Sequence, residues 1–132
     1  MLLSKDAILA ANDLQYEDVH VPEWGGTVRV RALTGAERDA FEAKMAEARQ
    51  KGMALGAALH NFRAKLVVRC IVDEQGKRLF SDDDAKALGT KSGAVLDRLF
   101  DVARRLSGMN EDAVEEAAKN SVTGQSAGST SA

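Results

Sequence analysis

The stretch that decides the fold is VHVPEWGGTVRV, residues 19–30. On both sides of its glycine pair, valines alternate with polar residues. This period of two predicts a β-hairpin at about residues 16–32 with the valines on one face. Gly25 and Gly26 supply the conformational freedom that a tight reversal needs. Pro22 cannot donate a ladder hydrogen bond, so the first arm is predicted to be an edge strand or to end there.

A helix is predicted directly after the hairpin. Thr34 and Glu37 have the T-x-x-E spacing of a capping box, in which each residue satisfies a free backbone N–H group at a helix start. The helix is expected to run to about Gln50, with charged residues over most of its surface. Its narrow apolar stripe consists of residues at helical spacing: Phe41, Met45 and Ala48.

Three further helices are expected to complete a bundle. The strongest apolar pattern in the chain covers about residues 54–72 and predicts the central core helix. A polar turn and a short extended piece at residues 78–80 follow it. Ser81 then caps a short helix, and a long amphipathic helix is predicted at about residues 92–106.

Each end of the chain predicts one more short helix. Ser4 is placed to cap a helix at residues 5–12, whose Ile8 and Ala11 are expected to face inward. Near the other end, a last helix is predicted at residues 111–119, although it carries a single large apolar residue. Its docking onto the bundle is therefore left open.

The composition bounds the class of protein. The 132 residues carry 45% hydrophobic but only 5% aromatic side chains, and the formal net charge is −2. Neither a deep aromatic pocket nor a general attraction to nucleic acid is expected from these values. No apolar run approaches the roughly 18 residues of a membrane span, and no signal peptide is expected.

We predict a mostly helical α+β fold. An N-terminal short helix and a β-hairpin precede a bundle of about four helices, and together they form one domain at residues 1–119. The last residues, 120–132, are mostly Ser, Thr, Gly and Ala. They are expected to be a disordered, low-complexity tail, because they bury too little apolar surface to offset the entropy of ordering.

No catalytic, cofactor-binding or metal-binding site is predicted. The chain holds two histidines and one cysteine, His20, His60 and Cys70, which are too few and too scattered for a zinc site. Cys70 lies on the apolar stripe of the expected core helix, which indicates a buried thiol. Residues 73–84 place cations where a calcium loop needs ligands, and residues 89–93 lack the glycine pattern of a phosphate loop. We therefore predict a non-enzymatic interaction module.

Six residues are the candidate contacts with a partner: Trp24, Arg29, Arg31, Met45, Met53 and Leu55. The tryptophan at the hairpin tip either covers the valine face or anchors an interface. The two arginines share one face of the hairpin, where they face solvent, a protein partner or phosphates. The methionines and the leucine either fill the core or form an adaptable apolar surface.

Three segments resemble one known family. VPEWGG and VRVRALTGAER, within residues 21–38, are similar to the N-terminal signature of the tail assembly chaperones of tailed bacteriophages and prophages. LSKDAIL at residues 3–9 and VDEQGKRLF at residues 72–80 resemble the same family, and the resemblance covers most of residues 3–120.

The resemblance implies a non-catalytic protein of the host cell cytoplasm. Such a protein binds the tape measure protein, a very long helical chain, and keeps it soluble while the tail tube assembles. It is absent from the finished virion. Contact with tail tube subunits and self-association are left open, and no membrane partner is expected.

Two other functions are kept as alternatives. One is a structural minor tail protein or head–tail connector that stays in the virion. The other is a small nucleic-acid-binding regulator that would use Arg29 and Arg31, although one small basic stripe in a net acidic chain is a weak signal for nucleic acid.

Overall fold

The computed structural model describes residues 1–51 and 61–109. Several predictions concern residues outside these ranges: the helix at 111–119, the tail at 120–132, Met53, Leu55, and the first part, 54–60, of the predicted core helix. The elements are α1 (Lys5–Ala10), β1 (Tyr16–Val21), the 3-10 turn η1 (Pro22–Trp24), β2 (Gly26–Arg31), α2 (Gly35–Gln50), α4 (Phe62–Cys70), β3 (Ile71–Val72), the 3-10 turn η2 (Asp82–Asp84), α5 (Ala85–Leu88) and α6 (Gly93–Leu106). They form the predicted α+β fold, which is mostly helical. No described helix is long and apolar enough to cross a membrane.

The hairpin forms as predicted and gains a third strand. β1 pairs antiparallel with β2, with Val19 opposite Val28. The reversal is the turn η1, which ends at Gly25 in the left-handed conformation (φ 76°). β2 also pairs with β3, so the strand order is β1-β2-β3. Val21 and Val30 are buried, which confirms the predicted apolar face of the hairpin.

The prediction of one continuous helix at residues 54–72 is wrong. Asn61 has a left-handed backbone conformation (φ 55°), which an uninterrupted α-helix does not allow, and α4 starts directly after it. α4 ends at Cys70, and Ile71 pairs with Val30 in the sheet. The apolar pattern runs on through β3 because both of its residues are buried. Periodicity alone cannot separate such a strand from a buried helix turn.

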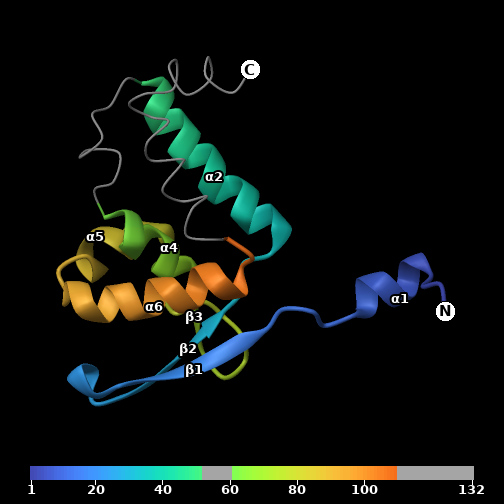
Figure 1. Ribbon diagram of the computed structural model, residues 1–132, viewed down its shortest axis with the longest axis horizontal. Coiled ribbons are helices and arrows are strands. Elements are labelled where there is room, and N and C mark those ends of the chain that lie inside the picture. The colour runs from blue at the N-terminus through green and yellow to red at the C-terminus, as the bar shows by residue number, and fades with distance from the viewer. Residues whose placement is uncertain (52–60, 110–132) are drawn as a thin grey trace, which may run out of the picture.

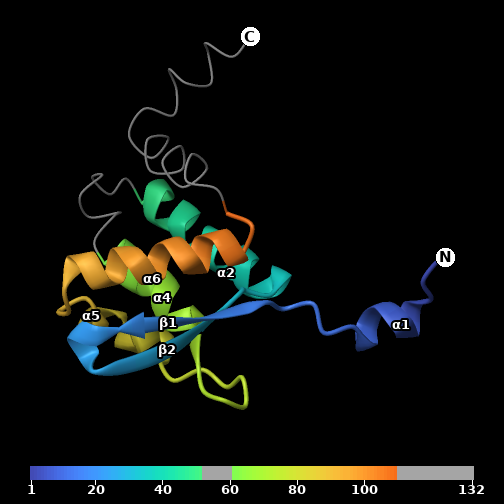
Figure 2. The same cartoon turned by 60° about the horizontal axis from the view of Figure 1, so that its bottom comes forward.

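The core lies between the inner face of the sheet and the helices α4 and α6 (Figures 1 and 2). Leu66 of α4 and Leu99 of α6 are among its largest fully buried side chains, which confirms α4 as a core helix. Phe62 contacts both Phe41 of α2 and Phe100 of α6, with ring centroids 5.6 Å apart in each pair. The aromatic contacts therefore join three helices.

α1 departs from the expected burial. Ser4 caps it as predicted, because its Oγ accepts a hydrogen bond from the Ala7 N–H at 3.1 Å. However, no residue of the helix is buried, Ile8 is 55% exposed, and Ala11 lies exposed just beyond the helix end. The prediction that Ile8 and Ala11 face inward is wrong, because the connection at residues 11–15 carries α1 away from the body (Figures 1 and 2).

Candidate functional site

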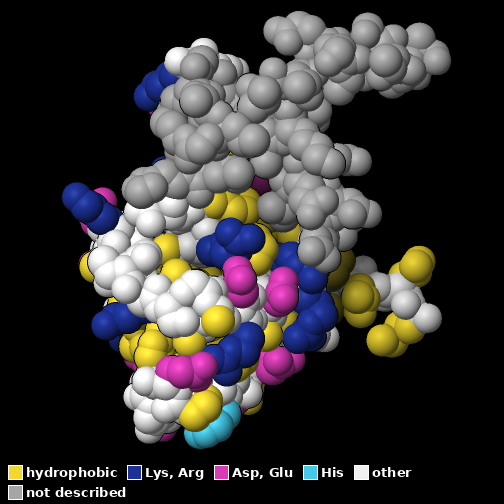
Figure 3. Space-filling view, turned by 60° about the vertical axis from the view of Figure 1, so that its left-hand side comes forward, with side chains coloured by type: hydrophobic (Ala, Val, Ile, Leu, Met, Phe, Trp, Pro, Cys, Tyr) yellow, Lys and Arg dark blue, Asp and Glu magenta, His cyan; other side chains and the backbone are white. Residues whose placement is uncertain are grey.

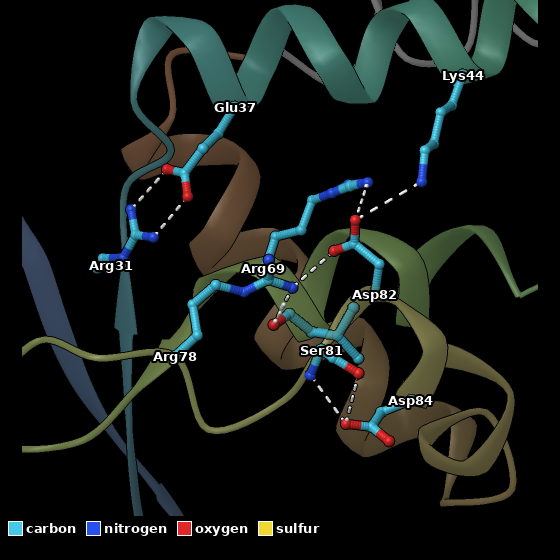
Figure 4. Close-up of polar contacts among 9 residues, drawn as sticks. Arg31, Glu37, Lys44, Arg69, Arg78, Ser81, Asp82 and Asp84 are labelled. Carbon is cyan, nitrogen blue, oxygen red and sulfur yellow. Dashed lines mark hydrogen bonds and ion pairs between the residues drawn. The ribbon is translucent and has the colours of Figure 1, made fainter.

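The start of α2 is fixed by the predicted capping box and by one added arginine. The Thr34 N–H donates to Glu37 Oε1 at 2.9 Å, and the Glu37 N–H donates to Thr34 Oγ1 at 3.1 Å. Arg31, at the end of β2, donates two hydrogen bonds of 2.8 Å to the same carboxylate (Figure 4). The Arg31 guanidinium, followed by the Thr34 N–H, lowers the pKa of Glu37 to about 2. The helix is thereby tied to the central strand of the sheet.

A second polar cluster lies beside the middle of α2. One carboxylate, Asp82 in η2, accepts from Arg78 at 2.7 Å and from Arg69 at 3.1 Å, and Lys44 of α2 lies 3.6 Å from it (Figure 4). The hydrogen bond from Arg78, with desolvation opposing it and the charge of Arg69 assisting, lowers the pKa of Asp82. Three cations from three segments therefore share one anion.

Arg69 is the buried member of this cluster. Its side chain is 7% exposed and its guanidinium lies 5.5 Å from the Phe41 ring centroid, a cation–π distance. Within the described residues, its Nη1 has no hydrogen-bond partner. A basic residue inside the apolar run LVVRCIV is the sequence signal for such a site, because a charge is rarely buried unless it is paired. The sequence analysis did not use this signal.

Met45 lies on the inner edge of α2. Phe41 of the same stripe is buried, and Met45 is half-buried against the core cluster. The neighbouring positions Glu42, Ala43 and Lys44 are exposed. The two polar clusters thus flank a helix that presents a half-buried methionine beside charged and small exposed residues.

The outer face of the sheet carries the two candidate arginines, and both are paired. Arg29 donates two hydrogen bonds to Asp18 on the facing strand, at 2.7 and 3.0 Å, and lies 4.1 Å from the Tyr16 ring centroid. Arg31 is bound to Glu37 as described above. On another side of the molecule, the left-hand end of Figure 1 that Figure 3 brings forward, basic and acidic side chains also lie next to each other without a broad patch of one sign. The basic stripe on which the nucleic-acid alternative depends is therefore neutralised by neighbouring carboxylates.

Two open hollows flank Arg29 on this outer face. One has a volume of about 460 Å³ and lies between Leu14, Tyr16 and the turn at residues 73–76. The other, of about 500 Å³, lies beside Leu79 on the far side of the same turn. Val72 lines both hollows. Sequence reasoning missed them because they depend on β3, which it had assigned to a helix.

Trp24 lies at the tip of the hairpin. It is half-buried and packs against the core cluster, and its neighbour Glu23 forms an ion pair with Arg98 of α6. The tip is therefore fastened to α6. This packing agrees with the first of the two interpretations of Trp24, the cover over the valine face.

Metal-ligating side chains and the thiol of Cys70 are the groups on which reactive chemistry would depend. Residues 1–51 and 61–109 contain no group of three or more His, Cys, Asp or Glu side chains placed to hold a metal ion. Cys70 is buried as predicted, and burial raises the pKa of its thiol to about 12. A thiol with so high a pKa is a poor nucleophile near neutral pH.

Comparisons with known proteins found similarity to one family. A family model described as phage tail assembly chaperone matches residues 4–120. Among solved structures, that of the bacteriophage HK97 tail assembly chaperone is similar, with 23% sequence identity and a TM-score of 0.53, over 70% of this chain and 85% of that one. At this identity the likeness shows a shared fold. No curated protein matches the chain.

Proposed function

The chain belongs to the phage tail assembly chaperone family, and on that premise we propose that it binds the tape measure protein during tail assembly. The family match over residues 4–120 is the observation that carries this proposal. The chaperone acts by non-covalent binding in the host cell cytoplasm and is absent from the finished virion. Residues 1–119 act as one domain, with residues 120–132 as its tail.

The inner edge of α2 is the proposed contact with the tape measure protein. An apolar helix docks against another helix through side chains at i, i+3 and i+4, and methionine adapts to many partner surfaces. Met45 contributes such a side chain, and Met53 and Leu55 follow it in the sequence. Support for this choice comes from the Glu37 cluster, which ties the start of α2 to β2, while Lys44 near Met45 lies 3.6 Å from Asp82.

Co-expression with tape measure fragments tests the function. With the chaperone present, we expect the fragments to stay in the soluble fraction and to elute with it on size exclusion. Fragments that aggregate equally with and without the chaperone would contradict the proposal. Mass spectrometry of purified virions tests the transient role, since a chain retained in the particle would be a structural tail protein instead.

A pair of matched variants tests the contact surface. Met45→Gln changes the half-buried apolar edge of α2, and Ala43→Gln introduces the same side chain at an exposed position two residues away. We expect the first variant to lower the yield of soluble complex and the second to leave it unchanged, while both keep the melting temperature within a few degrees. Equal yields would remove α2 as the contact.

A further inference from the structure

Three cations converge on one carboxylate between α2 and η2. Asp82 accepts from Arg78 at 2.7 Å and from Arg69 at 3.1 Å, and Lys44 Nζ lies 3.6 Å from it (Figure 4). The carboxylate of Asp84, nearby in Figure 4, is bound within its own capping box instead. The group of Lys44, Arg69, Arg78 and Asp82, which we call the Asp82 cluster, therefore carries two positive charges in excess.

The buried member of the Asp82 cluster has an unused donor. The Arg69 side chain is 7% exposed, and its Nη1 has no hydrogen-bond partner among the described residues. A buried charge is costly unless it is paired and hydrogen-bonded. Asp82 neutralises Arg69 only in part, because the same carboxylate also pairs with Arg78 and Lys44. The cluster is therefore suited to a ligand that brings a further negative charge.

The other two cations are within reach of such a ligand. The side chain of Lys44 is 63% exposed, and that of Arg78 is 31% exposed. Arg78 donates to Oδ1 of Asp82, whereas Lys44 faces Oδ2 at a distance too long for a hydrogen bond. Lys44 can therefore turn from Asp82 to a second carboxylate without breaking a hydrogen bond.

A single carboxylate on a docked helix fits the Asp82 cluster better than a phosphate does. Asp82 lies at the centre of the cluster, and its negative charge repels a doubly charged phosphate more strongly than a singly charged carboxylate. Lys44 also precedes Met45, the proposed apolar contact on α2. Since residues three or four apart on a helix are neighbours, a helix that covers Met45 brings its adjacent turn close to Lys44.

We infer that the Asp82 cluster binds one carboxylate of the tape measure protein. The carboxylate pairs with Lys44 and Arg78, and Arg69 supplies buried positive charge beneath them. This inference rests on the proposed function and adds the chemistry of the partner: an apolar helix face with an Asp or Glu within one turn of it. Because complementary charge contributes selectivity to an interface, the cluster favours such helices over helices that are only apolar.

Two variants that each remove one exposed lysine charge form the main test. Lys44→Gln alters the Asp82 cluster, and Lys91→Gln is the matched control on the connection between α5 and α6. Fluorescence anisotropy measures the Kd of the shortest tape measure fragment that elutes with the chaperone. We expect Lys44→Gln to raise this Kd about two- to fivefold, the size of an exposed ion pair, and Lys91→Gln to change it little.

The two proposals fail in different ways in this experiment. A wild-type chain that forms no complex with any fragment contradicts the proposed function, and the inference that rests on it falls as well. A complex whose Kd is the same for the wild type, Lys44→Gln and Lys91→Gln leaves the proposed function standing and contradicts the inference alone. Melting temperatures of both variants within a few degrees of the wild type show that the fold is kept.

Amide replacements in the fragment identify the partner carboxylate. Each Asp and Glu of the fragment is replaced in turn by Asn or Gln, and one replacement should raise the Kd as much as Lys44→Gln does. Combining that replacement with Lys44→Gln should add little, because both changes remove the same pair. If every replacement adds in full to Lys44→Gln, or if inorganic phosphate binds the free chaperone and Lys44→Gln abolishes that binding, the cluster serves a different anion and the inference is wrong.

Discussion

α1 and α6 both begin at a serine cap, but α6 packs into the core whereas α1 is exposed. Ser4 accepts from the Ala7 N–H at 3.1 Å, and Ser92 accepts from the Val95 N–H at 3.4 Å, so both helices have a serine cap. α6 buries six of its fourteen residues, whereas α1 buries none of its six. A cap therefore decides where a helix starts, while the length of its apolar stripe and the course of the flanking chain decide whether it packs.

The comparison is tested most strongly by shortening one leucine in each helix. Leu99 of α6 is fully buried, and Leu99→Ala should lower the free energy of unfolding by about 2–5 kcal/mol through lost burial and a cavity. Leu9→Ala should lower it by less than about 0.5 kcal/mol, because Leu9 is mostly exposed. Urea unfolding measures both. Similar losses in the two variants would mean that α1 packs on the body after all.

The packed body also depends on a polar contact for which α1 has no counterpart among the described residues. Asp82→Asn leaves the guanidinium of Arg69 buried without its counter-charge, which should cost about 1–3 kcal/mol. Asp83→Asn is the matched control, because Asp83 is exposed and takes part in no ion pair among the described residues. Equal melting temperatures for the two variants would show that Arg69 finds another partner.

The sequence predicts the local parts of this fold well. Serine and threonine caps marked the starts of α1 and α2, because a cap is a contact between residues three apart. The hairpin followed from alternation and its glycines, which also act over short distances. Period-two burial of Val21 and Val30 was confirmed for the same reason.

Contacts between distant segments could not be predicted from these local signals. β3 was missed because Ile71 and Val72 are buried on both sides and continue the apolar stripe of α4. The tie between Arg69 and Asp82 joins residues thirteen apart through a turn that no pattern describes. The pairing of Arg29 with Asp18 was within reach, since these residues lie opposite each other in the hairpin register.

Acid should lower the free energy of unfolding because it protonates Glu37. The pKa of this carboxyl falls from its ordinary 4.5 to about 2 in the folded chain, so its stabilising effect is present above pH 4.5 and is lost as the pH falls from 4.5 to 2. The loss should amount to about 1–2 kcal/mol after allowance for solvent screening. Unfolding by urea between pH 6 and pH 2.5 measures it. Glu37→Gln should be less stable than the wild type at pH 6 and should lose less on acidification; parallel pH curves would contradict the assignment.

The smallest expected losses of stability come from removing the serine caps of α1 and α6. Ser92→Ala removes the cap of a packed helix and should lower the free energy of unfolding by about 1 kcal/mol, since an unsatisfied N–H at the start of α6 weakens the whole body. Ser4→Ala removes the same contact from α1, where the loss is confined to local fraying and should leave global unfolding within about 0.3 kcal/mol of the wild type. Both are measured at a concentration low enough to dissociate any oligomer, with hydrogen exchange of the α1 amides to detect the fraying. A global loss from Ser4→Ala as large as that from Ser92→Ala would show that α1 unfolds together with the core, and the contrast between the two helices would then be one of exposure alone.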